Sequence, residues 1–189
     1  MRASNLALIV GTALAITTAP AEAAWKSYIS KTFGFSYEAP GEVKIETGAS
    51  RGQIAGPQET ISYVSTEDNI RYTVTVINFA QAQAESATIL GETHFMYQEG
   101  KRVLMDTFAR VEPGKDSVHG RKVTVDIPNN GGRSTAAFYF NKGYLIQLEA
   151  TVLPANGDYQ SPDPGRFIDS IAFSPARAGE GATELKLPE

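Results

Sequence analysis

The sequence predicts an α+β domain in which a central antiparallel sheet of about six strands is packed by one long helix and a short C-terminal helix. Three observations lead to this fold class. Apolar and polar residues alternate in several segments, which is the period of a half-buried strand. Turn residues such as those at 129–132, Asn-Asn-Gly-Gly, join neighbouring segments directly, as in β-hairpins. Residues 86–111 instead repeat their apolar side chains at helical spacing, so a helix covers one face of the sheet.

The amino end has the pattern of an export signal. Arg2 precedes an apolar run of about eleven residues, and the small residues Ala21 and Ala23 form an A-x-A cleavage motif. A membrane-spanning helix needs about 20 apolar residues, so an uncleaved anchor is the less favoured alternative. We therefore expect a signal peptide over residues 1–23, cut after Ala23 or after Ala24. The mature protein is then periplasmic or secreted, with no stable membrane anchor.

The rest of the chain is expected to form one domain over residues 24–173, followed by a loose tail over residues 174–189. Its composition, 42% hydrophobic and 20% charged, is that of an ordinary globular protein. The sequence contains no cysteine, which excludes disulfides, thiol nucleophiles and thiolate metal sites. The net charge of −4 is spread without blocks, which argues against nucleic acid or an anionic membrane surface as a partner.

The first predicted strand carries Phe33, Phe35 and Tyr37 at alternate positions and stops at a Pro-Gly turn. Residues 48–57 have the composition of a loop. The segments 59–65 and 70–79 then form a strand pair, joined by a short polar turn.

The long helix is predicted from residue 86 to residue 111, with Ser86 as its N-cap and a Pro-Gly pair after its end. Gly100 falls within the apolar stripe, where the missing side chain permits close approach to the sheet. Phe95 and Met105 lie on the outer side. The stripe that faces the sheet consists of Ile89, Leu90, Thr93, Met96, Tyr97, Gly100, Val103, Leu104, Thr107, Phe108 and Val111.

Three more strands are predicted over residues 121–128, 134–140 and 144–152, and the Asn-Asn-Gly-Gly turn joins the first two as a hairpin. A short helical stretch over residues 164–173 places Phe167 and Ile171 on one side, before the tail.

Two motifs in this layout resemble a known family. The opening W-K-x-Y followed by F-G-F-S-Y-E-A-P-G is similar to that of bacterial relatives of PsbP, an extrinsic subunit of the photosynthetic oxygen-evolving complex. The closing G-R-F-I-D-S-I-A-F resembles the final helix of the same family. The resemblance implies a sandwich of an antiparallel sheet with helical layers, and an accessory or binding role without an active site. In the opening motif the matching residues are Trp25, Tyr28, Gly34, Phe35, Pro40 and Gly41.

The two histidines do not form a catalytic or metal motif in the sequence. A helical metal pair needs a second ligand three or four residues from His94, and those positions hold Leu90, Gly91, Tyr97 and Gln98. We therefore interpret the region of His94 as a core helix that exposes a histidine. His119 is interpreted as a loop histidine, because Asp116 and Ser117 are too close to it in sequence to form a triad from separate elements.

One polar sheet face is the candidate binding surface, with an ordinary solvated face as the alternative. The predicted function is an exported, non-catalytic binding or accessory protein of the cell envelope that contacts a protein partner or a small polar ligand, with no cofactor or metal. The alternative is a periplasmic hydrolase that uses two carboxylates of this face, Asp126 and Glu149. The oligomeric state stays open. The residues of the candidate surface are Arg71, Thr124, Asp126, Gln147, Glu149 and Thr151.

Overall fold

A computed structural model describes residues 24–50, 52, 55–82, 84–111, 117–174 and 181–187, so the predicted leader, apart from Ala24, lies outside the described residues. The larger of two sheets has seven strands, all paired antiparallel. In spatial order its strands are β3 (Lys44–Ala49), β4 (Glu59–Glu67), β5 (Ile70–Asn78), β9 (Tyr144–Val152), β8 (Gly132–Asn141), β7 (Val118–Ile127) and β6 (Arg102–Val111).

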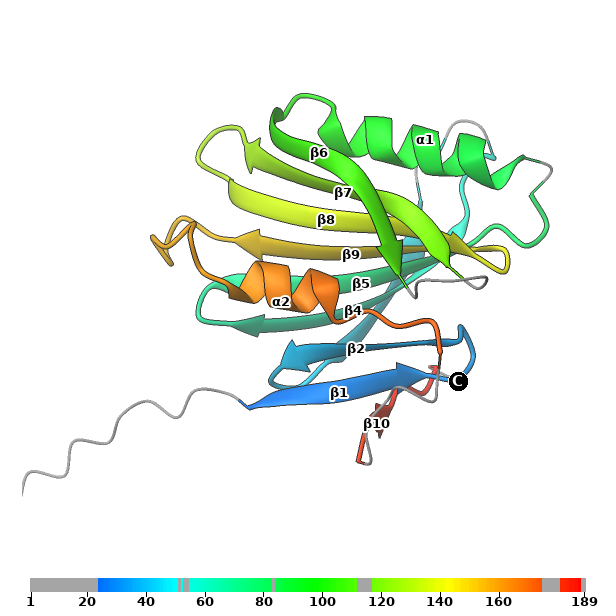
Figure 1. Cartoon of the computed structure of the whole chain (residues 1–189), viewed down its shortest axis with the longest axis horizontal. Coiled ribbons are helices and arrows are strands. Elements are labelled where there is room, and N and C mark those ends of the chain that lie inside the picture. Colours follow the sequence, from blue (N-terminus) through cyan, green and yellow to red (C-terminus); the bar gives the residue numbers. More distant parts are fainter. Residues whose placement is uncertain are drawn as a thin grey trace, which may run out of the picture.

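Within the described residues, a smaller sheet and two helices accompany the large sheet. The smaller sheet has the order β10 (Thr183–Glu184), β1 (Trp25–Ser30) and β2 (Phe35–Pro40). The helices are α1 (Ser86–Gln98) and α2 (Asp163–Asp169). Helix α1 packs on one face of the large sheet, while α2 and the small sheet pack on the other (Figure 1). The predicted α+β architecture is confirmed, with seven strands in the main sheet instead of about six. No helix within the described ranges has the length and hydropathy to span a membrane.

The main core lies between the large sheet and the layer formed by α2 and the small sheet. Phe167 of α2 is fully buried there, and its ring centroid lies 5.2 Å from that of Tyr72 and 5.9 Å from that of Tyr37. Both contacts have edge-to-face geometry, which is favourable for aromatic pairs. Ile171 is also buried, as predicted for the closing helical stretch. We refer to this side of the large sheet as the α2 face and to the opposite side as the α1 face.

The prediction of one helix from residue 86 to residue 111 is wrong in its second half. Helix α1 ends at Gln98, and residues 102–111 form β6, which pairs with β7 along its whole length. Gly100 has a φ of +70°, a left-handed conformation that stops the helix, so it turns the chain and does not pack against the sheet. After a bulge between Val103 and Met105, every second residue from Met105 to Val111 points to one face of the sheet, and this alternation was the strand signal that the helical spacing concealed.

The prediction of a loose tail is wrong for residues 183–185. Thr183 and Glu184 pair in parallel with Tyr28 and Ile29 of β1, and Leu185 is buried in the main core. The Asn-Asn-Gly-Gly hairpin is confirmed, since Asn129 and Asn130 have φ values of 56° and 57° between β7 and β8.

Candidate functional site

The strand registers divide the predicted polar surface between the two faces of the sheet. Side chains of residues directly opposite each other in a sheet point to the same face. Glu149 lies opposite Ala136, which in turn lies opposite Val123, so these three side chains point to one face. Asp126 is three residues after Val123 on the same strand, so it points to the other face, together with Arg133 opposite it. The interpretation of one common surface is therefore wrong. Arg71, Gln147, Glu149 and Thr151 belong to the α1 face, and Thr124 and Asp126 belong to the α2 face.

On the α1 face, Glu149 lies at the centre of a hydrogen-bonded network beneath the end of α1. Its Oε1 lies 2.8 Å from the hydroxyl of Ser134 and 3.1 Å from that of Tyr97, and these two hydroxyls are 2.8 Å apart. The amide of Gln147 donates to Oε2 at 3.2 Å, and the hydroxyls of Ser134 and Thr151 are 2.9 Å apart. Both carboxylate oxygens are thus held by neighbouring donors.

Burial controls the titration of the groups around Glu149. Desolvation raises the pKa of the Tyr97 hydroxyl far above its ordinary value, and the nearby carboxylate of Glu149 raises it further. Desolvation also lowers the pKa of Lys101, although Glu149 opposes this shift. The ammonium of Lys101 lies 3.8 Å from the ring centroid of Tyr97. Tyr97 therefore stays protonated at neutral pH and acts as a hydrogen-bond donor.

On the α2 face, Asp126 is held by a different partner. The Nε of Arg133 donates to its carboxylate at 2.8 Å, and this hydrogen bond is the main reason that the pKa of Asp126 lies below its ordinary value. Thr124 shares a hydrogen bond of 3.1 Å with Thr135. Because the sheet separates Asp126 from Glu149, the two carboxylates cannot act on one substrate.

A groove of about 360 Å³ lies between α1 and the strands β3 to β5. Thr75, Met96, Tyr97 and Gln147 are among its lining residues. Gln147 connects the groove to the network of Glu149. Hydroxyl and amide groups of Thr75, Tyr97 and Gln147 thus lie among the lining residues of this groove.

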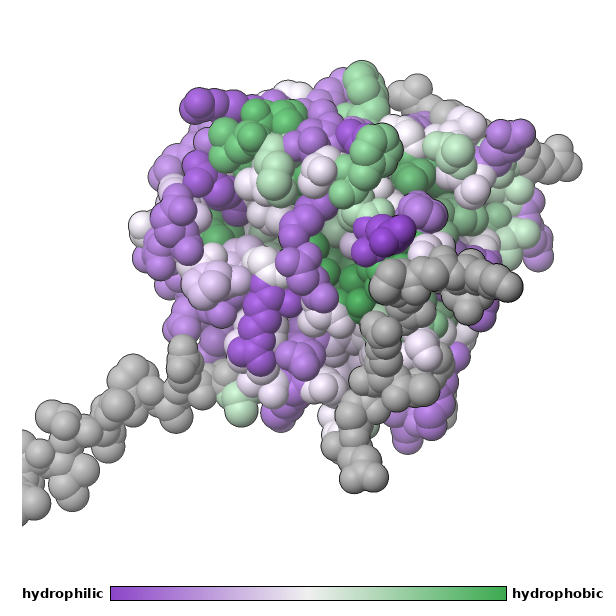
Figure 2. Space-filling model, viewed as in Figure 1, coloured by the Kyte–Doolittle hydropathy of each residue, from purple (hydrophilic) through white to green (hydrophobic). Residues whose placement is uncertain are grey.

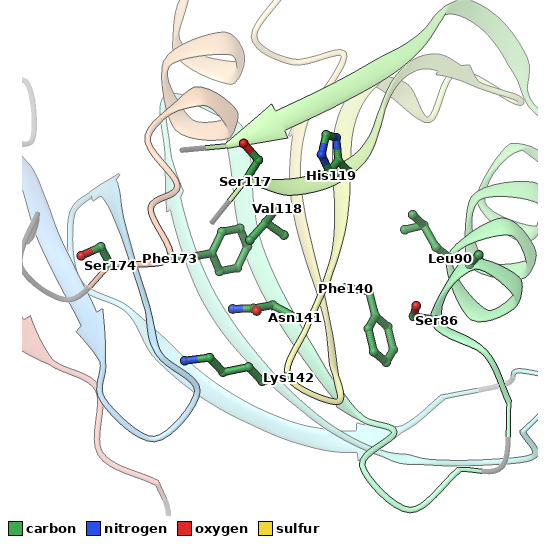
Figure 3. A pocket seen from close by; sticks show the side chains of 11 residues that line it. Ser86, Leu90, Ser117, Val118, His119, Phe140, Asn141, Lys142, Phe173 and Ser174 are labelled. Carbon is green, nitrogen blue, oxygen red and sulfur yellow. The ribbon is translucent and has the colours of Figure 1, made fainter. Parts of the chain in front are cut away.

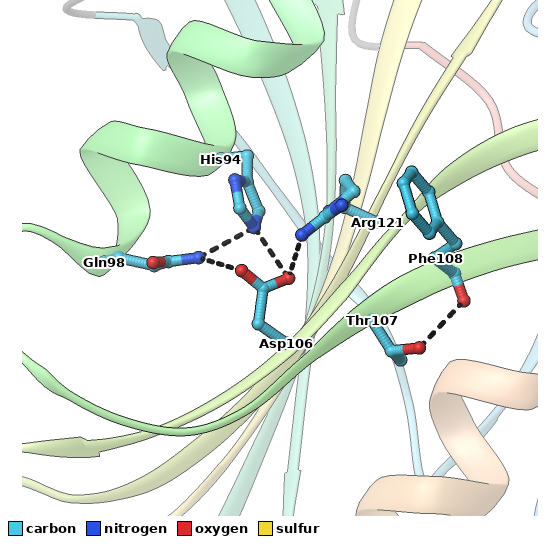
Figure 4. A network of polar contacts seen from close by, with 6 residues as sticks. All are labelled: His94, Gln98, Asp106, Thr107, Phe108 and Arg121. Carbon is cyan, nitrogen blue, oxygen red and sulfur yellow. Dashed lines mark hydrogen bonds and ion pairs between the residues drawn. The ribbon is translucent and has the colours of Figure 1, made fainter.

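His94 belongs to a polar cluster that joins α1 to β6 (Figure 4). Its Nε2 lies 3.0 Å from Oδ1 of Asp106 and 2.7 Å from the amide nitrogen of Gln98, and that amide donates to Oδ2 of Asp106 at 3.0 Å. Arg121 of β7 donates to the same Oδ1. The expected exposed histidine is thus largely covered, because the segment after α1 is a strand that brings Asp106 against it.

The cluster of His94 is an ion-pair network and not a metal site. Burial raises the pKa of Asp106, but hydrogen bonds from Gln98, Arg121 and His94 together lower it below its ordinary value. Across the described parts of the chain, no group of three histidine, cysteine, aspartate or glutamate residues has the geometry to hold a metal ion. Asp106 therefore ties the first strand after α1 to the helix itself.

His119 is exposed as the second residue of β7, so it lies in a strand and not in the loop that the sequence suggested. It lines a wide depression of about 780 Å³ together with Ser86, Lys142 and Phe140 (Figure 3). In this view the side chain of His119 points away from Lys142. Asp116 lies outside the described residues.

An apolar edge is formed by β6 and the outer side of α1, and the sequence pointed only to its members Phe95 and Met105 as outward-facing residues of one helix. Phe108 is 83% exposed and Phe95 is 69% exposed. Hydrophobic residues gather over α1 and β6 on the surface (Figure 2). The exposure of Phe95 agrees with its predicted place on the outer side of the helix. We define the apolar edge by its exposed members, which are Phe95, Val103, Leu104, Met105 and Phe108.

The solved structure of cyanobacterial PsbP (CyanoP) from Synechocystis sp. PCC 6803 is similar to this chain, with a TM-score of 0.50. The likeness covers 86% of this chain and 98% of the cyanobacterial one. The fold is PsbP-like. The resemblance found in the two sequence motifs is thereby confirmed at the level of fold, and the 11% identity carries no functional residue from one protein to the other. No family model and no curated protein matches the sequence.

Proposed function

We propose that this protein is an exported, non-catalytic accessory protein of the cell envelope that binds another protein through its apolar edge. The observation that carries the proposal is the concentration of exposed apolar side chains on β6 and α1. A soluble domain rarely leaves a large contiguous apolar surface uncovered unless the surface binds something. Four of the five members lie on a single strand at the border of the described sheet.

The arrangement of the carboxylates supports binding over hydrolysis. Asp126 and Glu149, the pair that the hydrolase alternative requires, lie on opposite faces of the sheet. A glycosidase-type pair needs its carboxyl groups on the same side of one substrate, about 5–10 Å apart. In addition, each carboxylate is already held by donors from its own face. These groups stabilise the fold, and they offer no pair of acid and base to a substrate.

Export is supported by the amino-terminal leader pattern, in which Arg2, an apolar run and Ala21-x-Ala23 follow each other. A protein partner is favoured over a small polar ligand because the exposed side chains of the apolar edge are hydrophobic, and such side chains suit burial against another protein. The groove remains available to a ligand in addition, since its lining residues do not belong to the apolar edge.

The proposal is tested by cross-linked capture of proteins from the envelope of the source cell. The full chain is expressed with its own leader and a C-terminal tag, as wild type, as Phe108→Asp and as Ile45→Asp. Ile45 is a matched control because it is an exposed apolar residue, 38% accessible, at the opposite border of the sheet. We expect capture of a defined protein by wild type and Ile45→Asp and its loss in Phe108→Asp. Capture that ignores both substitutions, or no capture at several salt concentrations, overturns the proposal.

A further inference from the structure

The outer border of β6 is an unpaired strand edge. The seven-stranded sheet ends at β6, which pairs with β7 on one side and with none of the other described strands on its other side. From Arg102 to Phe108 every residue is exposed. A long exposed edge is a template for a further strand, and proteins that avoid such pairing protect their edges with prolines, charges pointing inward or very short strands. The protection on β6 is a bulge between Val103 and Met105, which leaves Met105–Val111 regular.

The regular part of β6 is complementary to itself about Phe108. The register with β7 places Asp106, Phe108 and Arg110 on the α1 face. If two copies pair antiparallel with Phe108 opposite Phe108, Asp106 of each copy lies opposite Arg110 of the other. On the α2 face the same pairing sets Met105 opposite Val111. We propose that two copies of this chain pair in this way through β6, an inference that rests on the proposed function and names the partner as a second copy.

Symmetry limits which registers are available. When a two-fold axis perpendicular to the sheet relates the two strands, one residue lies directly opposite its own copy, and this residue is the centre of the pairing. Both α1 layers then lie on the same side of the joined sheet. A centre at Asp106 sets aspartate against aspartate, which is repulsive. A centre at Thr107 sets Asp106 against Phe108 and forms no ion pair. Phe108 is the centre that matches opposite charges twice.

The charged groups are available for this pairing. Arg110 is exposed, and none of the ion pairs among the described residues includes it. Asp106 accepts from His94 and Arg121 at Oδ1 but only from Gln98 at Oδ2 among its described contacts, which leaves an acceptor position on Oδ2. In the symmetric contact, the guanidinium of Arg110 from one copy becomes an additional partner of the Asp106 carboxylate of the other copy. The cluster that holds β6 to α1 stays in place.

Phe108 supplies the apolar centre of the contact. Its ring is held from its own chain by Arg121, whose guanidinium carbon lies 4.6 Å from the ring centroid. The ring is otherwise open to water, since the side chain is 83% exposed. Two such rings at the axis bury each other in an aromatic pair, flanked by the two ion pairs.

Cysteine substitution tests the register, because the chain has no cysteine of its own. Residues directly opposite in an antiparallel pair lie about 4.5–5.5 Å apart between Cα atoms, within the range of a disulfide. Full-length Phe108→Cys, oxidised in air with copper–phenanthroline, is therefore expected to form disulfide-linked dimers. In the same register, residue 107 of one copy lies about 7–8 Å from residue 107 of the other, so Thr107→Cys is expected to react slowly. Ile45→Cys, at the β3 border, is the second control.

The charge prediction is tested on the same background. Adding Arg110→Asp to Phe108→Cys places like charges opposite each other, and we expect the rate of dimer formation to fall about tenfold. Sedimentation of the wild-type protein over a concentration series is expected to show a monomer–dimer equilibrium. Equal cross-linking at residues 45, 107 and 108 overturns the inference, as does a wild-type protein that stays monomeric throughout. If that monomer still captures another envelope protein through Phe108, the proposed function stands and only the identity of the partner is wrong.

Discussion

Phe167 on α2 and Tyr97 on α1 are each buried between a helix and the same sheet, but their surroundings differ. Phe167 is fully buried among Tyr72, Tyr37 and the aliphatic side chains of β5 and β9. Tyr97 packs on Phe138 and directs its hydroxyl into the network of Ser134 and Glu149. The α2 face therefore stabilises the molecule mainly by apolar burial. The α1 face combines a smaller apolar core with polar contacts, and it borders the exposed apolar edge.

The two faces also differ in how much of the sheet they leave open to a binding partner. The α2 face is covered twice, by the helix and by the small sheet, so a change there disturbs the main core. The α1 face is covered by a single helix, and β6 extends beyond it as an open strand. Exposed apolar side chains of this strand, such as that of Phe108, can be substituted with little effect on stability.

The largest expected effect separates the two faces directly. Phe167→Ala empties a fully buried aromatic site and is expected to lower the free energy of unfolding by about 3–5 kcal/mol. Phe95→Ala, the matched substitution on the outer side of α1, is expected to change it by no more than about 0.5 kcal/mol. Urea denaturation followed by circular dichroism measures both. Similar losses for the two variants would contradict the assignment of stability to the α2 face.

The second prediction compares polar contacts on the two faces of one strand. Ser134→Ala removes a fully buried hydroxyl that contacts the carboxylate of Glu149, so we expect a loss of about 1–3 kcal/mol in the free energy of unfolding. Thr135→Val, on the α2 face, removes a hydrogen bond between the neutral hydroxyls of Thr135 and Thr124 and is expected to cost about 0.5–1.5 kcal/mol. The same denaturation experiment ranks them, and a larger loss for Thr135→Val would show that the network of Glu149 contributes little.

The smallest effect concerns acid stability at the junction of α1 and β6. The pKa of Asp106 is lower in the folded protein than in the unfolded chain, so the unfolded state takes up protons first as the pH falls. The stabilisation from Asp106 is complete above the unfolded value of about 3.9 and is lost as the pH falls through the folded value. Wild type is therefore expected to lose stability more steeply than Asp106→Asn below about pH 4.

Thermal unfolding of wild type and Asp106→Asn between neutral and acidic pH measures this slope. The acid profile of Asp126→Asn provides the comparison for the α2 face, because the hydrogen bond from Arg133 also lowers the pKa of Asp126. Parallel acid profiles for wild type and Asp106→Asn would mean that the cluster of His94 adds no pH-dependent stability.

The strands with one buried face and the Asn-Asn-Gly-Gly hairpin follow from the local sequence, because residue periodicity and turn chemistry are enough to predict them. The alternation in residues 70–79 and 144–152 predicts strands with one buried face, and Val74, Val76, Ile146 and Leu148 are indeed fully or almost fully buried. Asn129 and Asn130 predict the hairpin, since asparagine tolerates a positive φ. The PsbP-like fold was also recognisable from the two end motifs. The signal peptide and the envelope location stay predictions from the leader pattern.

Tertiary structure alone decided the rest, and the reason is pairing between distant strands. Whether Asp126 and Glu149 share a face depends on the registers of β7, β8 and β9, and a shift of one residue moves a side chain to the other face. Whether residues 102–111 form a helix or a strand depends on β7, which supplies the hydrogen bonds of the strand form. Local periodicity allowed both forms there, and the pairing that selected the strand also created the open apolar edge.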